Sequence, residues 1–414
     1  MKRATGAMKN ASRAMRKAPG IELSRRALAI EVSPTVAMSQ RAAARKAQGG
    51  AVLDFSVGEP DQPTPKHVAA AAVAAIHDGR TRYTPSAGLP ELRAAVAKRY
   101  AEDFGVAFAP SEVAISAGGK QALYLACQAL LDRGDEVVIP SPYWPTFAEA
   151  VRLAGARPVL APASEKDGFK VTARMIAKAA TPRTRAVILN SPSNPTGALI
   201  GARELLALAT WARRRKITLL YDDTYARLGF GGGEAPRLQA LRDEAGDRFV
   251  VLGTASKSYC MTGWRIGWVL GPKALVDACA ALVSHSTQCP TTFAQVGAIE
   301  ALTGPQALVD ELAAEYRRRR DFIHPQIAGI PGVTCVEPGG GFYLFPNVSR
   351  YLGGSAPSTL DLAGALLDEE GVATVAGEGF AAPGYLRLSF ARSMDDLALG
   401  AKRIRAFFAR REPR

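Results

Sequence analysis

The chain lacks the features that would mark a disulfide-bonded, metal-binding or membrane-spanning protein. Its five cysteines are scattered, without paired or metal-ligand spacing, at Cys127, Cys260, Cys279, Cys289 and Cys335. This pattern argues against a disulfide framework and against a metal site, and it predicts a reduced, cytoplasmic protein. No uninterrupted apolar run is long enough to cross a bilayer, so we predict no membrane partner.

Acidic residues are absent from the first twenty positions, where basic residues are frequent. Residues 1–20 contain Lys and Arg but no Asp or Glu, and they contribute to the formal net charge of +14. They lack the apolar core of a secretory signal, and no element that could read a nucleic-acid groove follows them. We predict a basic flexible tail over residues 1–20 and no nucleic-acid partner. Composition alone leaves an organelle-type presequence open.

The chain does contain enough apolar sequence for a large core. Hydrophobic residues make up 48% of its 414 positions, which suits two closely joined domains. Helical segments alternate with strand-like runs at 113–116, 135–140, 186–189, 217–220 and 249–253. This alternation predicts an α/β fold with a mostly parallel sheet and helices on both faces. Further strand-like runs at 333–336, 341–345 and 385–389 predict a smaller α/β domain near the end.

The stretch Thr254–Gly267 (T-A-S-K-S-Y-C-M-T-G-W-R-I-G) carries the strongest chemical signal. Lys257 follows a strand among small residues, and an amine on a crowded apolar turn is desolvated, which lowers its pKa. A neutral lysine amine can form a Schiff base with an aldehyde. Arg265 is a permanent cation suited to a phosphate. An aldehyde and a phosphate together describe pyridoxal 5'-phosphate (PLP).

Two further motifs follow strand ends, where open α/β sheets bind ligands. Ala117-Gly118-Gly119-Lys120-Gln121 is a strand–glycine–helix turn, which directs free N–H groups toward an anion. Residues 141–145 (S-P-Y-W-P) carry Trp144, which offers a flat face to a pyridine ring. Tight packing explains the turn equally well, and a solitary tryptophan is more often part of a core.

Polar residues also follow the next two strands. The loop 190–197 (N-S-P-S-N-P-T-G) is made rigid by its X-Pro steps and presents the amide of Asn194. Residues 221–225 (Y-D-D-T-Y) carry Asp222, a carboxylate that can keep a pyridine nitrogen protonated, and Tyr225. Near the C-terminus, Arg387 lies in an otherwise apolar strand and needs an anion, so either a bound carboxylate or an internal salt bridge is expected.

In this order, the motifs resemble those of class I (fold type I) PLP-dependent aminotransferases, in the aspartate aminotransferase superfamily. The resemblance runs from about residue 21 to the C-terminus. It implies a large PLP-binding domain over residues 65–305 and a small α/β domain formed by residues 21–64 and 306–414. It also implies a homodimer with shared active sites, whose small-molecule substrates are an amino acid and a 2-oxo acid.

The resemblance implies a role for each matching residue. Lys257 would bind PLP and act as base and then acid, while Asp222 would contact the ring nitrogen and Tyr225 the ring oxygen. The other implied cofactor contacts are Gly119, Lys120, Trp144, Asn194, Thr254, Arg265 and, from the neighbouring subunit, Tyr83. The implied substrate contacts are Gly58 of the G-E-P-D turn, Trp144, Asn194, Arg387, Lys120 and Thr35.

Substrate choice follows less directly from the resemblance. In the most similar subgroup, residues matching Lys120 and Thr35 help to bind a distal carboxylate, which favours aspartate or glutamate with 2-oxoglutarate, by ping-pong kinetics. An aromatic or prephenate aminotransferase remains an alternative, as does a PLP lyase or cyclase on the same fold. A PLP-binding transcription regulator would need a DNA-reading domain, which the first twenty or so residues are too short to hold.

Four departures from the family pattern leave specificity open. Pro34 replaces a usually small residue, Asp223 a glutamate, and Thr224 a bulky aliphatic residue, while Gly339–Gly341 has one glycine too many. None of them is an implied cofactor contact. A separate expectation concerns the helix around 309–322, whose Arg317–Arg320 run predicts a solvated face.

Overall fold

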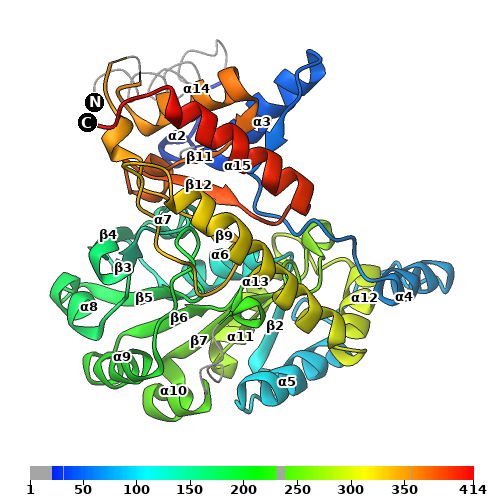
Figure 1. Ribbon diagram of the computed structural model, residues 1–414. Helices are drawn as coiled ribbons and strands as arrows, with labels where there is room; N and C mark the ends of the chain where they lie inside the picture. Colours follow the sequence, from blue (N-terminus) through cyan, green and yellow to red (C-terminus); the bar gives the residue numbers. More distant parts are fainter. Residues whose placement is uncertain (1–20, 31, 231–237, 355) are drawn as a thin grey trace.

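The computed structural model describes residues 21–30, 32–230, 238–354 and 356–414, so the predicted tail over residues 1–20 lies outside the described part. Figure 1 shows a larger assembly of strands and helices below and a smaller one above. The long helix α13 (Ala307–Ala328) runs obliquely between the two.

The larger assembly is built on a seven-stranded sheet in the order β2-β8-β7-β6-β5-β3-β4. These strands are β2 (Val113–Ser116), β3 (Glu136–Ser141), β4 (Arg157–Pro162), β5 (Thr184–Asn190), β6 (Thr218–Asp222), β7 (Phe249–Thr254) and β8 (Gly267–Leu270). Strand β8 is antiparallel to β2 and β7, and the remaining pairs are parallel. The prediction of an α/β fold with a mostly parallel sheet is therefore confirmed.

Helices cover both faces of this sheet (Figure 1). The helices of the larger assembly are α4 (Lys66–His77), α5 (Pro90–Phe104), α6 (Gly119–Leu130), α7 (Thr146–Leu153), α8 (Ala173–Ala179), α9 (Ala202–Arg215), α10 (Leu238–Ala245), α11 (Lys273–Ser284) and α12 (Thr292–Thr303), and α4 packs on α12 beside the sheet. Successive strand residues enter different cores: Val187 and Leu189 join one, and Ile188 joins the other. Burial on both faces explains why the strands read as continuous apolar runs.

The smaller assembly combines both ends of the described chain. It contains α2 (Arg25–Ala29), α3 (Pro34–Ala47), α14 (Thr359–Glu370), α15 (Met394–Ala409) and the short strands β1 (Leu53–Asp54), β9 (Tyr343–Leu344), β10 (Val372–Ala373), β11 (Val375–Ala376) and β12 (Leu386–Ser389). Met38 and Phe55 share one core with Leu362 and Phe407. The N-terminal segment and the last hundred residues therefore pack together.

One predicted strand is wrong. Within residues 333–336, only Thr334 forms a β-bridge, with Asn347. The carbonyl of Cys335 lies 3.0 Å from the Nε2 atom of His324 on α13, so it contacts a side chain instead of a neighbouring strand. The apolar residues of this run suggested a strand. Apolar content does not show which group the backbone will bond to, so the prediction was wrong.

The prediction of a solvated arginine face on α13 is also wrong in part. Arg319 and Arg320 are buried, whereas Arg318 is exposed. The Nη1 atom of Arg319 lies 2.7 Å from the Asp61 carboxylate, and its Nε atom lies 2.7 Å from Glu315. Because acids from its own helix and from the G-E-P-D turn neutralise it, this guanidinium can be buried.

Several other features bear on the class of protein. Among the described residues, no helix is both long and apolar enough to cross a bilayer, and no cluster of three or more His, Cys, Asp or Glu side chains could hold a metal ion. All five cysteines are free thiols.

The buried ion pair of α13 generates a stability prediction. Arg319→Met should lower the free energy of unfolding by about 3 kcal/mol, because the partly buried Asp61 carboxylate is left without its cation. Urea unfolding monitored by circular dichroism measures this loss. Arg318→Met is the matched control: it removes an exposed partner of the same Glu315 and should leave the unfolding curve within experimental error. Equal losses for the two variants would contradict the argument.

Candidate active site

A cavity of about 390 Å³ lies where the two assemblies meet. Its walls include twelve of the thirteen residues that the sequence nominated, drawn from strand ends, loops and the small assembly: Thr35, Gly58, Gly119, Lys120, Trp144, Asn194, Asp222, Tyr225, Thr254, Lys257, Arg265 and Arg387. The thirteenth, Tyr83, does not line it and has 83% of its surface exposed.

Adjacent strands bring several of these residues together. Asn190 at the end of β5 pairs in register with Asp222 at the end of β6, and Asp222 pairs in turn with Leu252 of β7. The chain then continues through Thr254 into the lysine segment. Carboxyl ends of parallel strands meet at one edge of a sheet. The lysine segment, the carboxylate and the amide loop therefore lie side by side.

The Lys257 amine lies close to a backbone carbonyl. Its Nζ atom donates a hydrogen bond of 2.6 Å to the carbonyl oxygen of Gly58. Burial lowers the pKa of Lys257 to about 8; the carboxylate of Glu59 opposes this shift, and the nearby cations, Arg387 and Arg265 among them, add to it. An amine with this pKa is partly neutral near physiological pH, as a nucleophile or a proton acceptor must be.

A cradle for a phosphate forms around the start of α6. Gly118 has a φ of 86°, and a Cβ atom there would collide with the guanidinium of Arg265. The helix begins at Gly119, so its first N–H groups are free to bind an anion. The buried hydroxyl of Thr254 lies 2.8 Å from that of Ser256 in the same wall. Arg265 itself is exposed at the rim, anchored by Nη1 to the carbonyl of Thr262 at 2.7 Å.

Asp222 and Tyr225 form the wall behind the lysine. Asp222 is buried and accepts the backbone N–H of Thr224 at 3.0 Å, and burial raises its pKa to about 6. It is therefore mainly ionised at neutral pH. The hydroxyl of Tyr225 lies 2.9 Å from that of Tyr343. These groups present one carboxylate and one phenol to the cavity.

Arg387 is the most informative residue of the site. Its side chain is fully buried, yet among the described residues it forms no ion pair with an acid. Its Nη1 atom donates to Asn194 Oδ1 at 3.1 Å and Nη2 to the Ser56 carbonyl at 2.7 Å, while Nε has no partner. The internal salt bridge considered from the sequence is thus not found in the described chain. A buried guanidinium with an orphaned N–H is suited to a carboxylate ligand.

Two further cavity residues come from different helices, Lys120 from α6 and Thr35 from α3. Lys120, exposed at the rim, has its Nζ atom 5.4 Å from the centre of the Trp144 ring. Partial burial and then the charge of Arg265 lower the pKa of Lys120. Thr35, in the first turn of α3, has its hydroxyl 3.4 Å from Arg387 Nη2.

The departures from the family pattern take definite positions. Asp223 is absent from the cavity wall and is buried behind it, where it accepts a hydrogen bond of 2.5 Å from Tyr100. Thr224 does line the cavity. A Cβ atom on Gly379 would collide with the ring of Pro34, so the proline packs closely on that glycine. In the extra-glycine segment, a Cβ on Gly340 would meet Pro192.

Several lining residues were not nominated from the sequence. They include Asn190, Ser256 and Tyr343. Each lies inside a segment already singled out: Asn190 opens the N-S-P-S-N-P-T-G loop, Ser256 precedes Lys257, and Tyr343 lies in the strand-like run 341–345. Motif membership was the available signal, but only three-dimensional contact shows which members reach the cavity.

The donor set fits PLP. The partly neutral amine can react with the aldehyde, and the helix N-terminus with Arg265 can bind the phosphate. The Asp222 carboxylate can pair with a protonated ring nitrogen. The unpaired guanidinium of Arg387 remains for a substrate carboxylate. The same cavity can therefore accommodate both a cofactor and an amino acid.

Comparison with known proteins identifies the family. Residues 51–404 match the family described as aminotransferase class I and II. The chain belongs to this family. It is 42% identical, over 94% of its length and 100% of the relative's, to an aspartate aminotransferase of Geobacillus stearothermophilus. It is 40% identical to an aspartate/prephenate aminotransferase of Cereibacter sphaeroides, covering 92% of this chain and 97% of that protein.

Solved structures show the same relationship. The aspartate aminotransferase of Thermus thermophilus with maleate superposes with a TM-score of 0.89 at 38% identity, covering 94% of this chain and 100% of that one. This aminotransferase thus has the fold type I architecture and the PLP dependence of its family, as the sequence motifs predicted.

The environment of Lys257 generates a prediction about pH. The rate at which apoprotein captures PLP should rise with pH around a midpoint near 8, because only the neutral amine reacts and burial has lowered its pKa from 10.5. Stopped-flow absorbance measures this rate. Glu59→Gln should shift the midpoint lower, since the Glu59 carboxylate favours the charged amine. A midpoint near 10.5, or an upward shift in Glu59→Gln, would contradict the prediction.

Proposed function

We propose that this aminotransferase transfers the amino group between aspartate or glutamate and a 2-oxo acid, with 2-oxoglutarate as the preferred acceptor. The observation that carries the proposal is a cavity in which, besides Lys257 and Arg265, two more cations have no acid partner among the described ion pairs: Arg387 and Lys120. A dicarboxylic amino acid has two anionic ends. Relatives named as aspartate aminotransferases, and one solved with maleate, support the same choice.

The proposed roles combine these contacts with the family resemblance. Arg387 and Asn194 hold the α-carboxylate, with the backbone of Gly58 close by, and Lys120 and Thr35 receive the distal carboxylate. PLP, when bound, supplies a ring that accepts the electron pair released at the α-carbon. Lys257 Nζ removes the α-proton as base and returns a proton as acid, which its lowered pKa favours. Asp222 keeps a proton on the ring nitrogen, and Tyr225 donates to the ring oxygen.

The remaining cofactor residues are assigned to the phosphate and the ring. We propose that the backbone of Gly119 and Lys120, the hydroxyl of Thr254 and the guanidinium of Arg265 bind the phosphate. Trp144 stacks on the ring. The two halves of the reaction use one cavity in turn, so the kinetics are ping-pong.

We propose that the enzyme is a homodimer with shared active sites. Tyr83 is exposed, and Val73 and Ile76 of α4 expose an apolar surface on a hollow that also includes Arg265. A partner on this surface would bring its own Tyr83 toward the phosphate cradle. Light scattering should then give about twice the chain mass of 43.8 kDa. A monomeric mass in a fully active sample would refute the assignment.

The free thiols support a cytoplasmic location.

A second candidate substrate class is aromatic or prephenate-like. Thr224 lines the cavity where the family usually has a bulky aliphatic residue, which leaves additional room, and one relative is named as an aspartate/prephenate aminotransferase. A PLP lyase or cyclase would use the same cofactor contacts and is distinguished by its product.

The half-reaction with aspartate tests the proposal. PLP-loaded enzyme mixed with aspartate alone should give pyridoxamine phosphate and oxaloacetate in equal amounts, measured by absorbance and chromatography. Release of ammonia or a cyclised product would identify a lyase or cyclase instead. Lys257→Ala is the control and should lose the visible absorbance of the lysine-bound cofactor. It should also lower turnover by roughly 10⁴-fold while remaining folded.

The distal-carboxylate proposal has its own test. Lys120→Ala should lower kcat/KM for aspartate by about 10- to 100-fold, because a charge-assisted contact is lost, and should change the value for phenylalanine much less. Steady-state kinetics with both amino acids measures the difference. An equal fall in kcat/KM for the two substrates would mean that Lys120 contacts the cofactor and not the distal carboxylate.

A further inference from the structure

Gln306, the N-terminal cap of α13, contacts both segments that carry the reactive groups of the site. Its Oε1 atom accepts a hydrogen bond of 2.9 Å from the hydroxyl of Tyr259 and one of 3.2 Å from Arg227 Nη1. Tyr259 is two residues from Lys257, and Arg227 is two residues from Tyr225. One amide oxygen therefore bridges the lysine segment and the tyrosine turn.

The amide of Gln306 is itself fixed. Its Nε2 atom donates to the carbonyl of Ala301 at 3.0 Å and to that of Gly304 at 2.8 Å. These bonds settle which end of the side chain faces Tyr259 and Arg227. The bridging oxygen is thus held by the loop between α12 and α13.

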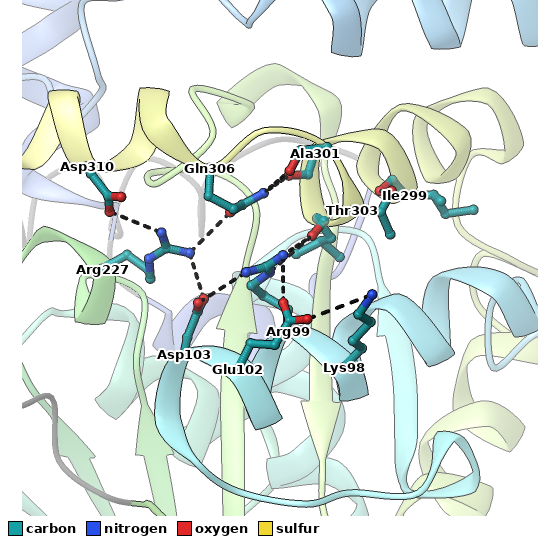
Figure 2. A network of polar contacts seen from close by, with 12 residues as sticks. Lys98, Arg99, Glu102, Asp103, Arg227, Ile299, Ala301, Thr303, Gln306 and Asp310 are labelled. Carbon is teal, nitrogen blue, oxygen red and sulfur yellow. Dashed lines mark hydrogen bonds and ion pairs between the residues drawn. The ribbon is translucent and has the colours of Figure 1, made fainter.

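Arg227 is held from several sides, as Figure 2 shows. Its Nη1 atom lies 2.6 Å from Asp103 at the end of α5, and Nη2 lies 3.3 Å from Asp310 on α13. Arg99 completes the cluster: it pairs with Asp103 at 3.3 Å and donates to the carbonyl of Leu302 at 2.8 Å. The Arg227 and Asp103 side chains are mostly buried, with exposures of 16% and 13%. Low exposure strengthens these contacts relative to surface ion pairs.

Short turns transmit any displacement to the cavity. Leu228 N–H donates to the Tyr225 carbonyl at 2.8 Å, so the turn that carries Arg227 is closed on Tyr225. On the other side, Met261 N–H donates to the Ser256 carbonyl at 3.1 Å, so the turn that carries Tyr259 encloses Lys257. Neither turn has a long loop that could absorb a shift of its anchoring side chain.

The same helix reaches a third wall of the cavity. Arg319 on α13 pairs with Asp61, three residues from Gly58, whose carbonyl accepts the Lys257 amine. Tyr316 packs on Phe342 with ring centres 5.4 Å apart, and Phe342 packs on Tyr225 at 5.4 Å. Helix α13 therefore supports the amine, the phenol and the turn against which the amine rests.

We propose that Gln306, Tyr259 and Arg227 are positioning residues that set the Lys257 amine and the Tyr225 hydroxyl in the geometry that PLP requires. None of the three lines the cavity, so they act through the two residues that do. This inference rests on the proposed roles of Lys257 and Tyr225.

A double-mutant cycle tests the network. Tyr259→Phe removes one hydroxyl and keeps the ring, and Gln306→Met removes the bridge at similar volume. Each should weaken PLP binding to the apoprotein by roughly 3- to 30-fold, measured by absorbance titration. The double variant should match Gln306→Met alone, because both changes break the same bridge. Each single variant should also lower kcat with little change in KM for aspartate and shift the visible absorbance of the bound cofactor.

A control and a rescue separate positioning from general stability. Asp310→Asn weakens one ion pair of Arg227 at an acid that is 75% exposed, and it leaves Gln306 in place, so PLP affinity should stay within twofold of wild type. Arg227→Lys keeps a cation for Asp103 and should retain more affinity than Arg227→Met. Thermal unfolding of each apoprotein checks that the variants are folded.

The inference is overturned if folded Tyr259→Phe keeps wild-type PLP affinity and absorbance, or if the two single effects simply add. The proposed function has a separate test in Lys257→Ala. If that variant keeps the visible absorbance of the bound cofactor, Lys257 does not bind PLP covalently. The positioning role proposed for the three residues is then overturned as well. If it loses this absorbance while Tyr259→Phe behaves as wild type, only the positioning role is overturned.

Discussion

A buried guanidinium without an acid partner is the interaction on which the rest of the site depends. Withdrawing a cation from water is costly unless an anion replaces the water. Arg387 is stabilised in part by the Ser56 carbonyl, the Asn194 amide oxygen and the face of Tyr343, whose centre lies 4.4 Å from its Cζ atom. The Nε–H group of Arg387, which has no partner in the described chain, can donate to a bound carboxylate. Burial, with a smaller contribution from this positive charge, lowers the pKa of the nearby lysine amine and keeps it partly neutral.

The sheet places the functional side chains around the cavity. Strands β5, β6 and β7 are neighbours, and each ends in a residue or segment that faces the cavity. The small assembly supplies Arg387 from β12 and the wall around Thr35 from α3. Helix α13 ties the two assemblies together through buried polar contacts such as the pair Arg319–Asp61. Reactive groups from distant parts of the chain thus rest on rigid elements.

Much of the fold and the site could be predicted because the informative signals are local. The apolar runs ending at Ser116 and Asn190 mark strands buried on both faces, and polar motifs follow them directly. Of the thirteen nominated residues, Tyr83 alone lies off the cavity, and its implied partner is another subunit. Family resemblance supplied the assignment of roles, which spacing and composition could not.

What could not be predicted depends on contacts between residues far apart in the chain. A run of arginines reads as a solvated face until Asp61 is brought to Arg319. The run 333–336 reads as a strand until His324 approaches the carbonyl of Cys335. The position of Asp223 behind the cavity likewise depends on a distant residue, Tyr100, which donates a hydrogen bond to it. In each case the local sequence pattern gave no information about the distant residue that determines the structure.

The contact between Pro34 and Gly379 has a consequence for access to the cavity. Because the proline ring rests on a residue that has no side chain, the first turn of α3 is seated on the segment that also carries Phe380. Phe380 in turn lies 5.0 Å beneath the guanidinium of Arg387. The wall that bears Thr35 is therefore coupled to the carboxylate-binding arginine. A displacement of the first turn of α3 would therefore reach the carboxylate-binding arginine through Gly379 and Phe380.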